Sequence, residues 1–329
     1  MLKTSFTDME KTQLKIVFFG TPDFAVESLR RMVEGGYNVV AVVTAPDKPA
    51  GRGKHLQMPA VKQYALEAGL PVMQPVRLKD EDFIAELRSY GAELFVVIAF
   101  RMLPEAVWTM PRFGTFNLHA SLLPRYRGAA PINWAVINGD TRTGVTTFFL
   151  QHEIDTGDII DREEIDILPD DDAGSVHDRL MTLGADLTVK TIDRILAGNL
   201  TSTPQSMITD AEPSPAPKIF KDTCHLDFSR PAREVHNLVR GLSPYPTAWA
   251  ELCESGEPKG TLKIFTTAVA EPVAEPLIPG RVTVSADLRL WVDCADGRLE
   301  LLSVQAQGKR RMPAADFLRG CRLTDMSLR

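Results

Sequence analysis

The first half of the chain alternates short apolar strands with amphipathic helices, and this alternation constrains the fold more than any other feature. Strand-like runs occupy residues 14–20, 38–44, 93–99 and 114–118. Apolar residues at helical spacing fill residues 22–33, 61–68 and 80–88 between them. Because the strands are nearly continuous Val, Ile and Phe runs, helices should cover both faces of the sheet. The sequence therefore predicts a doubly wound α/β domain with a mostly parallel sheet.

The pattern of predicted elements changes in the second part of the chain. Residues 144–150 and 158–164 predict one more strand pair, and residues 173–197 a long helix. Residues 201–217 then hold four prolines among Thr and Ser, which is typical of an extended linker. Short strand-like runs separated by Gly, Pro and Asp follow, at residues 247–252, 261–266, 281–284, 288–292 and 299–304. Five short strands after a linker favour a small β-barrel of the OB-like kind.

These patterns predict four segments. Residues 1–13 should be a disordered N-terminal extension, residues 14–200 the α/β domain, residues 201–217 the linker and residues 218–329 the barrel.

Composition narrows the classes of protein that remain. The formal net charge of −6 excludes a strongly basic protein that coats nucleic acid, although a local basic patch remains possible. No apolar run is long enough to span a membrane, and residues 1–13 lack the apolar core of a secretory signal. The four cysteines are scattered without a CxxC pair, which argues against a disulfide framework or a zinc knuckle. We expect a soluble, cytoplasmic protein.

Several common catalytic motifs are absent. Gly20 ends the first strand, but the next glycine is Gly35, so the dinucleotide fingerprint is missing. Lys48 stands where a Walker loop ending at Lys54 would need its first glycine. Neither a G-x-S-x-G elbow nor a paired-histidine motif occurs. An NAD enzyme, a P-loop NTPase, a covalent acyl-enzyme and metal catalysis are all disfavoured.

Two polar side chains mark the end of the fourth strand. Asn117 and His119 are two residues apart, so they should share one face at the carboxyl edge, where open α/β sheets bind ligands. Asp155 follows in a turn-like segment, from which a carboxylate could orient an imidazole and stabilise its charged form. Such a set suits acyl-type transfer, with the amide and imidazole stabilising an oxyanion. From spacing alone, a structural Asn and His beside an ordinary turn are the commoner explanation of this pattern.

At these residues the sequence resembles the methionyl-tRNA formyltransferase family, within the folate-dependent formyltransferases. The resemblance extends from about residue 14 to about residue 320. Five separated motifs carry it: GTPDFA at residues 20–25, PDKPAGRGK at 46–54, NLHASLLP at 117–124, DTGD at 155–158 and SPYPTAW at 243–249. Together they are far more specific than the Asn-x-His stretch, which alone indicates only the wider superfamily.

The resemblance implies transfer of the formyl group of 10-formyltetrahydrofolate to the α-amino group of methionyl initiator tRNA, without a metal. Asn117, His119 and Asp155 would be the catalytic residues. The implied folate contacts are Ser121, Leu122, Leu123 and Pro124, and the implied tRNA contacts in the inserted basic loop are Arg52 and Lys54. Charge near the C-terminus adds Lys309 and Arg310 as candidate tRNA contacts, with an ordinary solvated surface as the alternative. Two substrates and two domains require no partner chain, so we expect a monomer.

Three other interpretations stay open. A formyltransferase for a small amine, such as a purine-pathway ribonucleotide or an amino-sugar nucleotide, would use the same three residues. The hydrolase half of a formyltetrahydrofolate dehydrogenase, or an RNA-binding module on an inactive transferase fold, would also fit. Besides the N-terminal extension, the chain departs from the family pattern at residues 100–102 and 151–154, which flank the expected folate pocket and leave the catalytic residues intact.

Overall fold

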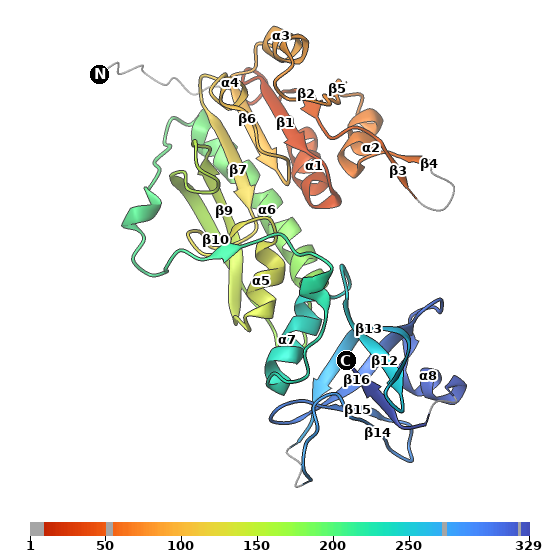
Figure 1. Ribbon diagram of the computed structural model, residues 1–329. Coiled ribbons are helices and arrows are strands. Elements are labelled where there is room, and N and C mark those ends of the chain that lie inside the picture. Colours follow the sequence, from red (N-terminus) through yellow and green to blue (C-terminus); the bar gives the residue numbers. More distant parts are fainter. Residues whose placement is uncertain (1–9, 51–54, 272–274, 322–323) are drawn as a thin grey trace. The chain divides into compact units, whose positions relative to one another are not determined.

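The structure is a computed structural model that describes residues 10–50, 55–271, 275–321 and 324–329. The chain forms two compact units, shown as ribbons in Figure 1. Unit 1 comprises Met1–Gly128, Gly144–Ile165 and His177–Pro215, and unit 2 comprises Ala129–Thr143, Asp166–Val176 and Ala216–Arg329. The units differ from the expected boundaries, because two short segments placed in the α/β domain by the sequence group with unit 2.

The sheet of unit 1 has the strand order β10-β9-β7-β6-β1-β2-β5. Its strands are β1 (Ile16–Gly20), β2 (Val39–Val43), β5 (Val72–Met73), β6 (Leu94–Ile98), β7 (Thr115–His119), β9 (Arg142–Phe149) and β10 (Ile159–Asp166). Pairing from β5 through β7 is parallel, and β9 runs antiparallel to β7. Numbered along the chain, the five parallel strands have the order 3-2-1-4-5 of a doubly wound sheet, so this prediction is confirmed.

Helices cover both faces of this sheet. The bounds in unit 1 are η1 (Asp23–Ala25), α1 (Val26–Glu34), α2 (Ala60–Glu67), α3 (Glu81–Ser89), α4 (Glu105–Trp108), α6 (Ala173–Leu196) and η2 (Gln205–Met207). Phe83 and Leu87 of α3 pack with Val17 and Phe19 on one face. On the other face, Thr191 of α6 hydrogen-bonds Thr147 of β9 in the buried interior. Short β3 (Lys48–Ala50) and β4 (His55–Gln57) pair as an antiparallel hairpin that the sequence did not predict.

The prediction of a disordered N-terminal extension is wrong where the structure describes this segment. Residues 10–13, expected to be disordered, form a turn, and Asn38 donates hydrogen bonds to the carbonyl oxygens of Lys11 and Thr12. Residues 1–9 lie outside the described residues. Most residues of the expected linker are exposed, but Thr203 bridges to Ile159 of β10 and Gln205 is only 5% exposed. Proline content indicated the irregular backbone correctly, but it carried no information about burial.

Unit 2 is built on an antiparallel sheet with the order β14-β15-β16-β13-β12-β18, and β17 pairs with β16. The bounds are α5 (Pro131–Ile137), η3 (Asp222–Cys224), α7 (Ala232–Leu242), β12 (Ala248–Glu254), β13 (Glu257–Val269), β14 (Val282–Val284), β15 (Leu290–Asp293), β16 (Arg298–Ala306), β17 (Met312–Pro313), α8 (Ala314–Gly320) and β18 (Met326–Leu328). The amide of Leu328 donates to the carbonyl of Gly280, which brings the two edges together. The sheet is therefore a nearly closed barrel, as predicted. The remaining two-stranded sheet pairs β8 (Arg127–Gly128) with β11 (Pro215–Ala216).

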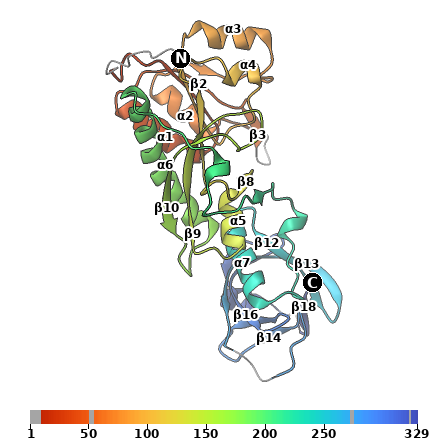
Figure 2. The same cartoon turned by 90° about the vertical axis from the view of Figure 1, so that its left-hand side faces the viewer.

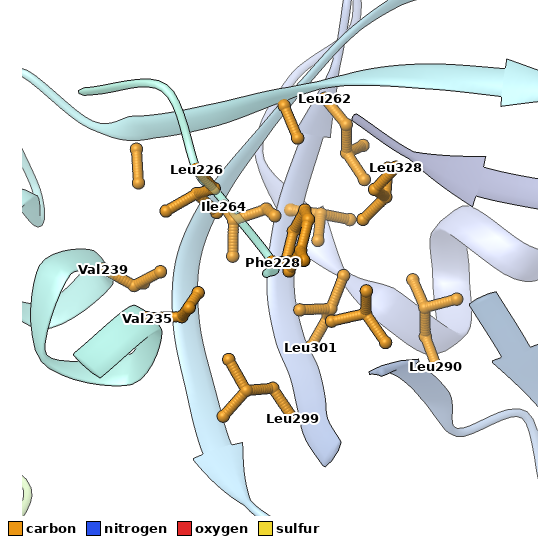
Figure 3. Packing of buried hydrophobic residues seen from close by; sticks show 14 of the residues in the cluster. Leu226, Phe228, Val235, Val239, Leu262, Ile264, Leu290, Leu299, Leu301 and Leu328 are labelled. Atoms are coloured by element: carbon orange, nitrogen blue, oxygen red, sulfur yellow. The ribbon is translucent and has the colours of Figure 1, made fainter. Parts of the chain in front are cut away.

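The core of unit 2 gathers around Phe228, which is 3% exposed. Figure 3 shows Val235 and Val239 of α7 facing the barrel residues Ile264 and Leu301. Turning the ribbon by 90° in Figure 2 shows α7 beside the strands of the same unit. Alternate residues of β12, β13 and β15 supply part of this core, as expected when one face of a strand is buried.

Asp293 at the end of β15 is fully buried and charged. It accepts hydrogen bonds from Arg281 and Arg298 and from the amide of Ile278. Burial alone would raise the pKa of Asp293, but the amide and the two guanidinium groups outweigh it and hold the pKa below its ordinary value.

Candidate active site

Asn117 and His119 lie at the carboxyl end of β7, between β6 and β9, where the sequence placed them. Asn117 pairs in register with Val97, and His119 pairs with Thr146. The ring of His119 is 6% exposed and meets Phe148 edge-on. Asn117 is partly exposed, and its amide makes no side-chain hydrogen bond within the described part of the chain. The site therefore presents a buried imidazole beside an amide that can still donate to a ligand.

A main-chain carbonyl orients His119. Its Nε2 lies 2.8 Å from the oxygen of Tyr126, and because a carbonyl oxygen can only accept, Nε2 carries the hydrogen. Nδ1 is then the ring atom left for chemistry, and it lies 3.8 Å from Oδ2 of Asp155. That separation is too long for a direct hydrogen bond. We expected the carboxylate to orient the imidazole, but the closer partner of the ring is the carbonyl of Tyr126.

Asp155 sits in the loop between β9 and β10 in a left-handed backbone conformation, with φ of 54°. Its Oδ2 accepts a hydrogen bond from the amide of Gly128 at 2.9 Å. Asp residues tolerate this backbone region better than most, and the bond to Gly128 turns the carboxylate toward the end of β7. The two elements that carry the predicted residues thus meet at one edge of the sheet.

The segment expected to contact folate is built into the loop after β7. Ser121 is buried and donates from its hydroxyl to the carbonyl of Arg125 at 2.7 Å. Thr146 of β9 braces the same loop, since its hydroxyl donates to the carbonyl of Ser121 and accepts from the amide of Leu123. Leu123 and Pro124 are buried, whereas Leu122 is partly exposed. Among these four side chains, that of Leu122 is the most accessible to solvent.

The expected tRNA contacts fall in two places. Arg52 and Lys54 lie outside the described residues. At the base of their loop, Lys62 and Gln74 donate to the carboxylate of Asp47 and lower its pKa. Lys309 and Arg310 are exposed in the turn between β16 and β17 of unit 2. Neither has an ion-pair partner among the residues that the structure describes.

The two departures from the family pattern line one open pocket. This pocket, of about 420 Å³, is lined by Arg101, Met102 and His152 among others. Arg101 donates to the carbonyl oxygens of Pro75 and Val76, and burial lowers the pKa of its guanidinium group. Residues that depart from the pattern at separate points of the sequence therefore shape the same surface.

One side chain and two main-chain groups that support the site were not predicted from the sequence. Tyr126, Gly128 and Gln205 each hydrogen-bond to His119 or Asp155. Two of these contacts use the main chain, which any residue can supply, and the third comes from a segment with the composition of a linker. No pattern in the sequence signals them.

Two absences hold for the described residues. No group of three or more His, Cys, Asp or Glu side chains there could hold a metal ion. No helix within the same residues is long and apolar enough to cross a membrane.

Comparison with protein families decides the affiliation. A model described as "Formyl transferase" matches residues 14–192, and one described as "Formyl transferase, C-terminal domain" matches residues 218–322. The chain belongs to the formyl transferase family. Among these formyl transferases, the relative in Parabacteroides distasonis named methionyl-tRNA formyltransferase is 57% identical over 317 residues, covering 95% of this chain and 97% of its own. One of the same name in Bacteroides fragilis is 54% identical over 318 residues, covering 96% and 98%.

Solved structures share the fold at low sequence identity. The sugar 3N-formyl transferase WlaRD has a TM-score of 0.63 and 19% identity, covering 90% of this chain and 99% of its own. HypX from Aquifex aeolicus, in complex with tetrahydrofolic acid, has a TM-score of 0.61 and 15% identity, covering 92% of this chain and 46% of its own. Identities this low establish the fold alone.

Proposed function

We propose that this formyl transferase transfers the formyl group of 10-formyltetrahydrofolate to the α-amino group of methionyl initiator tRNA. The observation that carries the proposal is the identity above 50% over nearly the full length of relatives named methionyl-tRNA formyltransferase. The intact Asn117, His119 and Asp155 at one sheet edge support an active enzyme.

The transfer needs no covalent enzyme intermediate. The neutral amine attacks the formyl carbon, forming a new C–N bond and a tetrahedral oxyanion. The bond to the folate nitrogen then breaks, and that nitrogen takes up a proton in exchange for the one that the amine loses. The protein has to stabilise the oxyanion and guide this proton.

The residues at the end of β7 suit both tasks. The amide of Asn117 has donors to spare, which suits an oxyanion that develops beside it. Because Nε2 of His119 is committed to Tyr126, Nδ1 is the atom that takes or gives a proton, and when protonated it donates to the oxyanion. The carboxylate of Asp155, 3.8 Å away, stabilises the imidazolium in that state. His119 thus acts as proton carrier and donor through one nitrogen.

Unit 2 offers a surface for RNA. An open pocket of about 590 Å³ is lined by Lys221, Lys263, Tyr245 and Trp249 among others, and it reaches Gly308 beside Lys309. Tyr245 is 81% exposed, so its ring is accessible for stacking. Aromatic rings interleaved with cations are typical of surfaces that bind single-stranded nucleic acid. We assign this surface, with Lys309 and Arg310, to tRNA docking.

The substrates also suggest where and how the enzyme works. Charged initiator tRNA and folate are cytoplasmic substrates, so we propose a cytoplasmic enzyme. Both reactants bind one chain in this scheme, so we propose a monomer.

Single-turnover formylation tests the proposal. The enzyme, in excess over methionine-charged initiator tRNA, is mixed with 10-formyltetrahydrofolate, and a parallel reaction offers a small free amine. Formyl transfer confined to the charged tRNA is expected. Transfer to the small amine, or release of formate without an acceptor, would overturn the tRNA assignment while leaving the chemistry of the site intact.

Replacing Asn117 tests the mechanism. Asn117→Ala removes an oxyanion donor, and losing one such donor costs about 100- to 1000-fold in kcat, with a modest change in KM. Steady-state kinetics with both substrates measures the change. An unchanged kcat would contradict the assignment of Asn117 as an oxyanion donor.

A further inference from the structure

Gln205 occupies a position that a linker residue would not be expected to hold. It begins η2 in the segment between α6 and β11, and its side chain is 5% exposed. A buried side-chain amide is stable only when its hydrogen-bonding groups find partners. Both N–H donors and the oxygen of the Gln205 side chain have hydrogen-bond partners, which indicates that the contact is specific.

All the partners of this amide belong to the active-site frame. Nε2 donates to the carbonyl oxygens of Asp155 and Gly157, each at 2.9 Å. Oε1 accepts from Nε of Arg127 at 3.1 Å and from its terminal nitrogen at 2.6 Å. The side chain therefore joins the Asp155 loop to the strand β8 that carries Arg127.

This linkage secures the catalytic carboxylate from its main-chain side. Asp155 has its backbone in the left-handed region, and the loop residues before it, Gln151 to Ile154, are exposed to solvent. Gly128 holds the carboxylate of Asp155, and Gln205 holds the carbonyl groups on both sides of Thr156. The positive charge of Arg127 beside Oε1 polarises the amide of Gln205 and strengthens the two hydrogen bonds that its N–H groups donate.

We infer that Gln205 is a positioning residue for formyl transfer, which fixes the main chain of the Asp155 loop so that the carboxylate faces His119. This inference rests on the proposed function, since it takes Asp155 as a catalytic residue. Gln205 acts through Asp155, with its own amide committed to protein partners.

Removal of the hydrogen bonds without a change in volume is the direct test. Gln205→Met keeps the length of the side chain and loses every hydrogen bond. We expect kcat to fall about 10- to 100-fold, because small displacements of a catalytic group have effects of that size, while KM for both substrates stays within about 3-fold. Gln205→Asn, which keeps the amide but is too short to reach both carbonyls, serves if Gln205→Met does not yield folded protein. Gln63→Met, at an exposed glutamine of α2 that donates to one carbonyl, is the matched control and should keep wild-type kinetics.

A double-mutant cycle separates positioning from general structural damage. In an Asp155→Ala background, Gln205 has no carboxylate left to place, so Gln205→Met should lower the residual rate by less than about 2-fold. The same fold-loss in both backgrounds would overturn the inference, as would a single variant with wild-type kcat.

A readout independent of catalysis keeps the inference separate from the proposed function. Hydrogen exchange of the peptide covering residues 151–158 should be faster in Gln205→Met than in the wild type, while Gln63→Met leaves it unchanged. Unaltered exchange would overturn the positioning role. If the wild type does not formylate charged tRNA, the proposed function fails, yet the exchange measurement still decides whether Gln205 holds this loop.

Discussion

Gly157 leaves no room for a side chain, and this makes it a sharp test of how the Asp155 loop is held. A Cβ at this position would lie 1.7 Å from the carbonyl oxygen of Phe149, a main-chain atom at the end of β9. Since real Cβ contacts essentially never fall below 3.0 Å, Gly157→Ala must displace the loop or the strand by about 1.3 Å. Phe149 is fixed by its pairing with Phe116 of β7, so the loop should move.

The displacement reaches the catalytic carboxylate, because Asp155 is two residues away and Gly157 shares the amide of Gln205. A shift of about 1 Å at a catalytic group costs on the order of 100-fold in rate, which is the loss in kcat that we expect. We also expect the crowding to lower the free energy of unfolding by about 1–3 kcal/mol.

Single-turnover formylation measures the first effect, and urea unfolding measures the second. Gly320→Ala is the control, because a Cβ there meets no atom within 4 Å. If Gly157→Ala folds and its kcat stays within about 3-fold of the wild type, the predicted displacement of the Asp155 loop is wrong, because the loop then accommodates the methyl group without moving Asp155.

Three further predictions concern unit 2. Leu301→Ala leaves a cavity at a core position that is 1% exposed, so it should lower the free energy of unfolding in urea by about 2–5 kcal/mol. Leu302→Ala, at the next residue and 40% exposed, should lower it by less than about 1 kcal/mol. Equal losses would contradict the packing in Figure 3. Asp293 has a lowered pKa in the folded state, so its stabilising contribution is present at neutral pH and is lost as pH falls below about 4 through the folded value. Asp293→Asn should therefore lower stability by about 2–3 kcal/mol at pH 7, and by clearly less near pH 3, in urea titrations at each pH; a pH-independent loss would contradict this. Replacing Lys309 and Arg310 together by Gln should weaken tRNA binding and reduce the slope of log affinity against log salt by about 2; an unchanged slope would remove them from the docking surface.

The organisation of the fold was largely readable from the sequence. The strands β1, β2, β6 and β7 and the helices α1, α3 and α6 follow apolar periodicities that are local properties of the chain. The hairpin of β3 and β4 and the short helix α5 were missed, because strands of three residues and a helix of seven are too short to show a period. Burial of Gln205 within the predicted linker was missed, because a segment rich in Pro, Ser and Thr is usually exposed.

The candidate site also has features that the sequence predicted and others that it did not. Spacing on one strand was enough to place Asn117 and His119 on a common face at the carboxyl edge, since side chains alternate along every strand. The carbonyl of Tyr126 and the amide of Gly128 could not be predicted, because main-chain groups are the same in every residue and only their position distinguishes them.

From the sequence alone, the mostly parallel sheet, the barrel and the residues proposed to carry the chemistry could be predicted, because periodicity and residue type are local properties of the chain. Tertiary structure alone decided which nitrogen of His119 faces Asp155, and that Gln205, 50 residues further along, holds the Asp155 loop. The physical reason is that hydrogen-bond direction and burial arise between segments distant in sequence. Their partners are chosen only when the chain has folded and water has been excluded from the site.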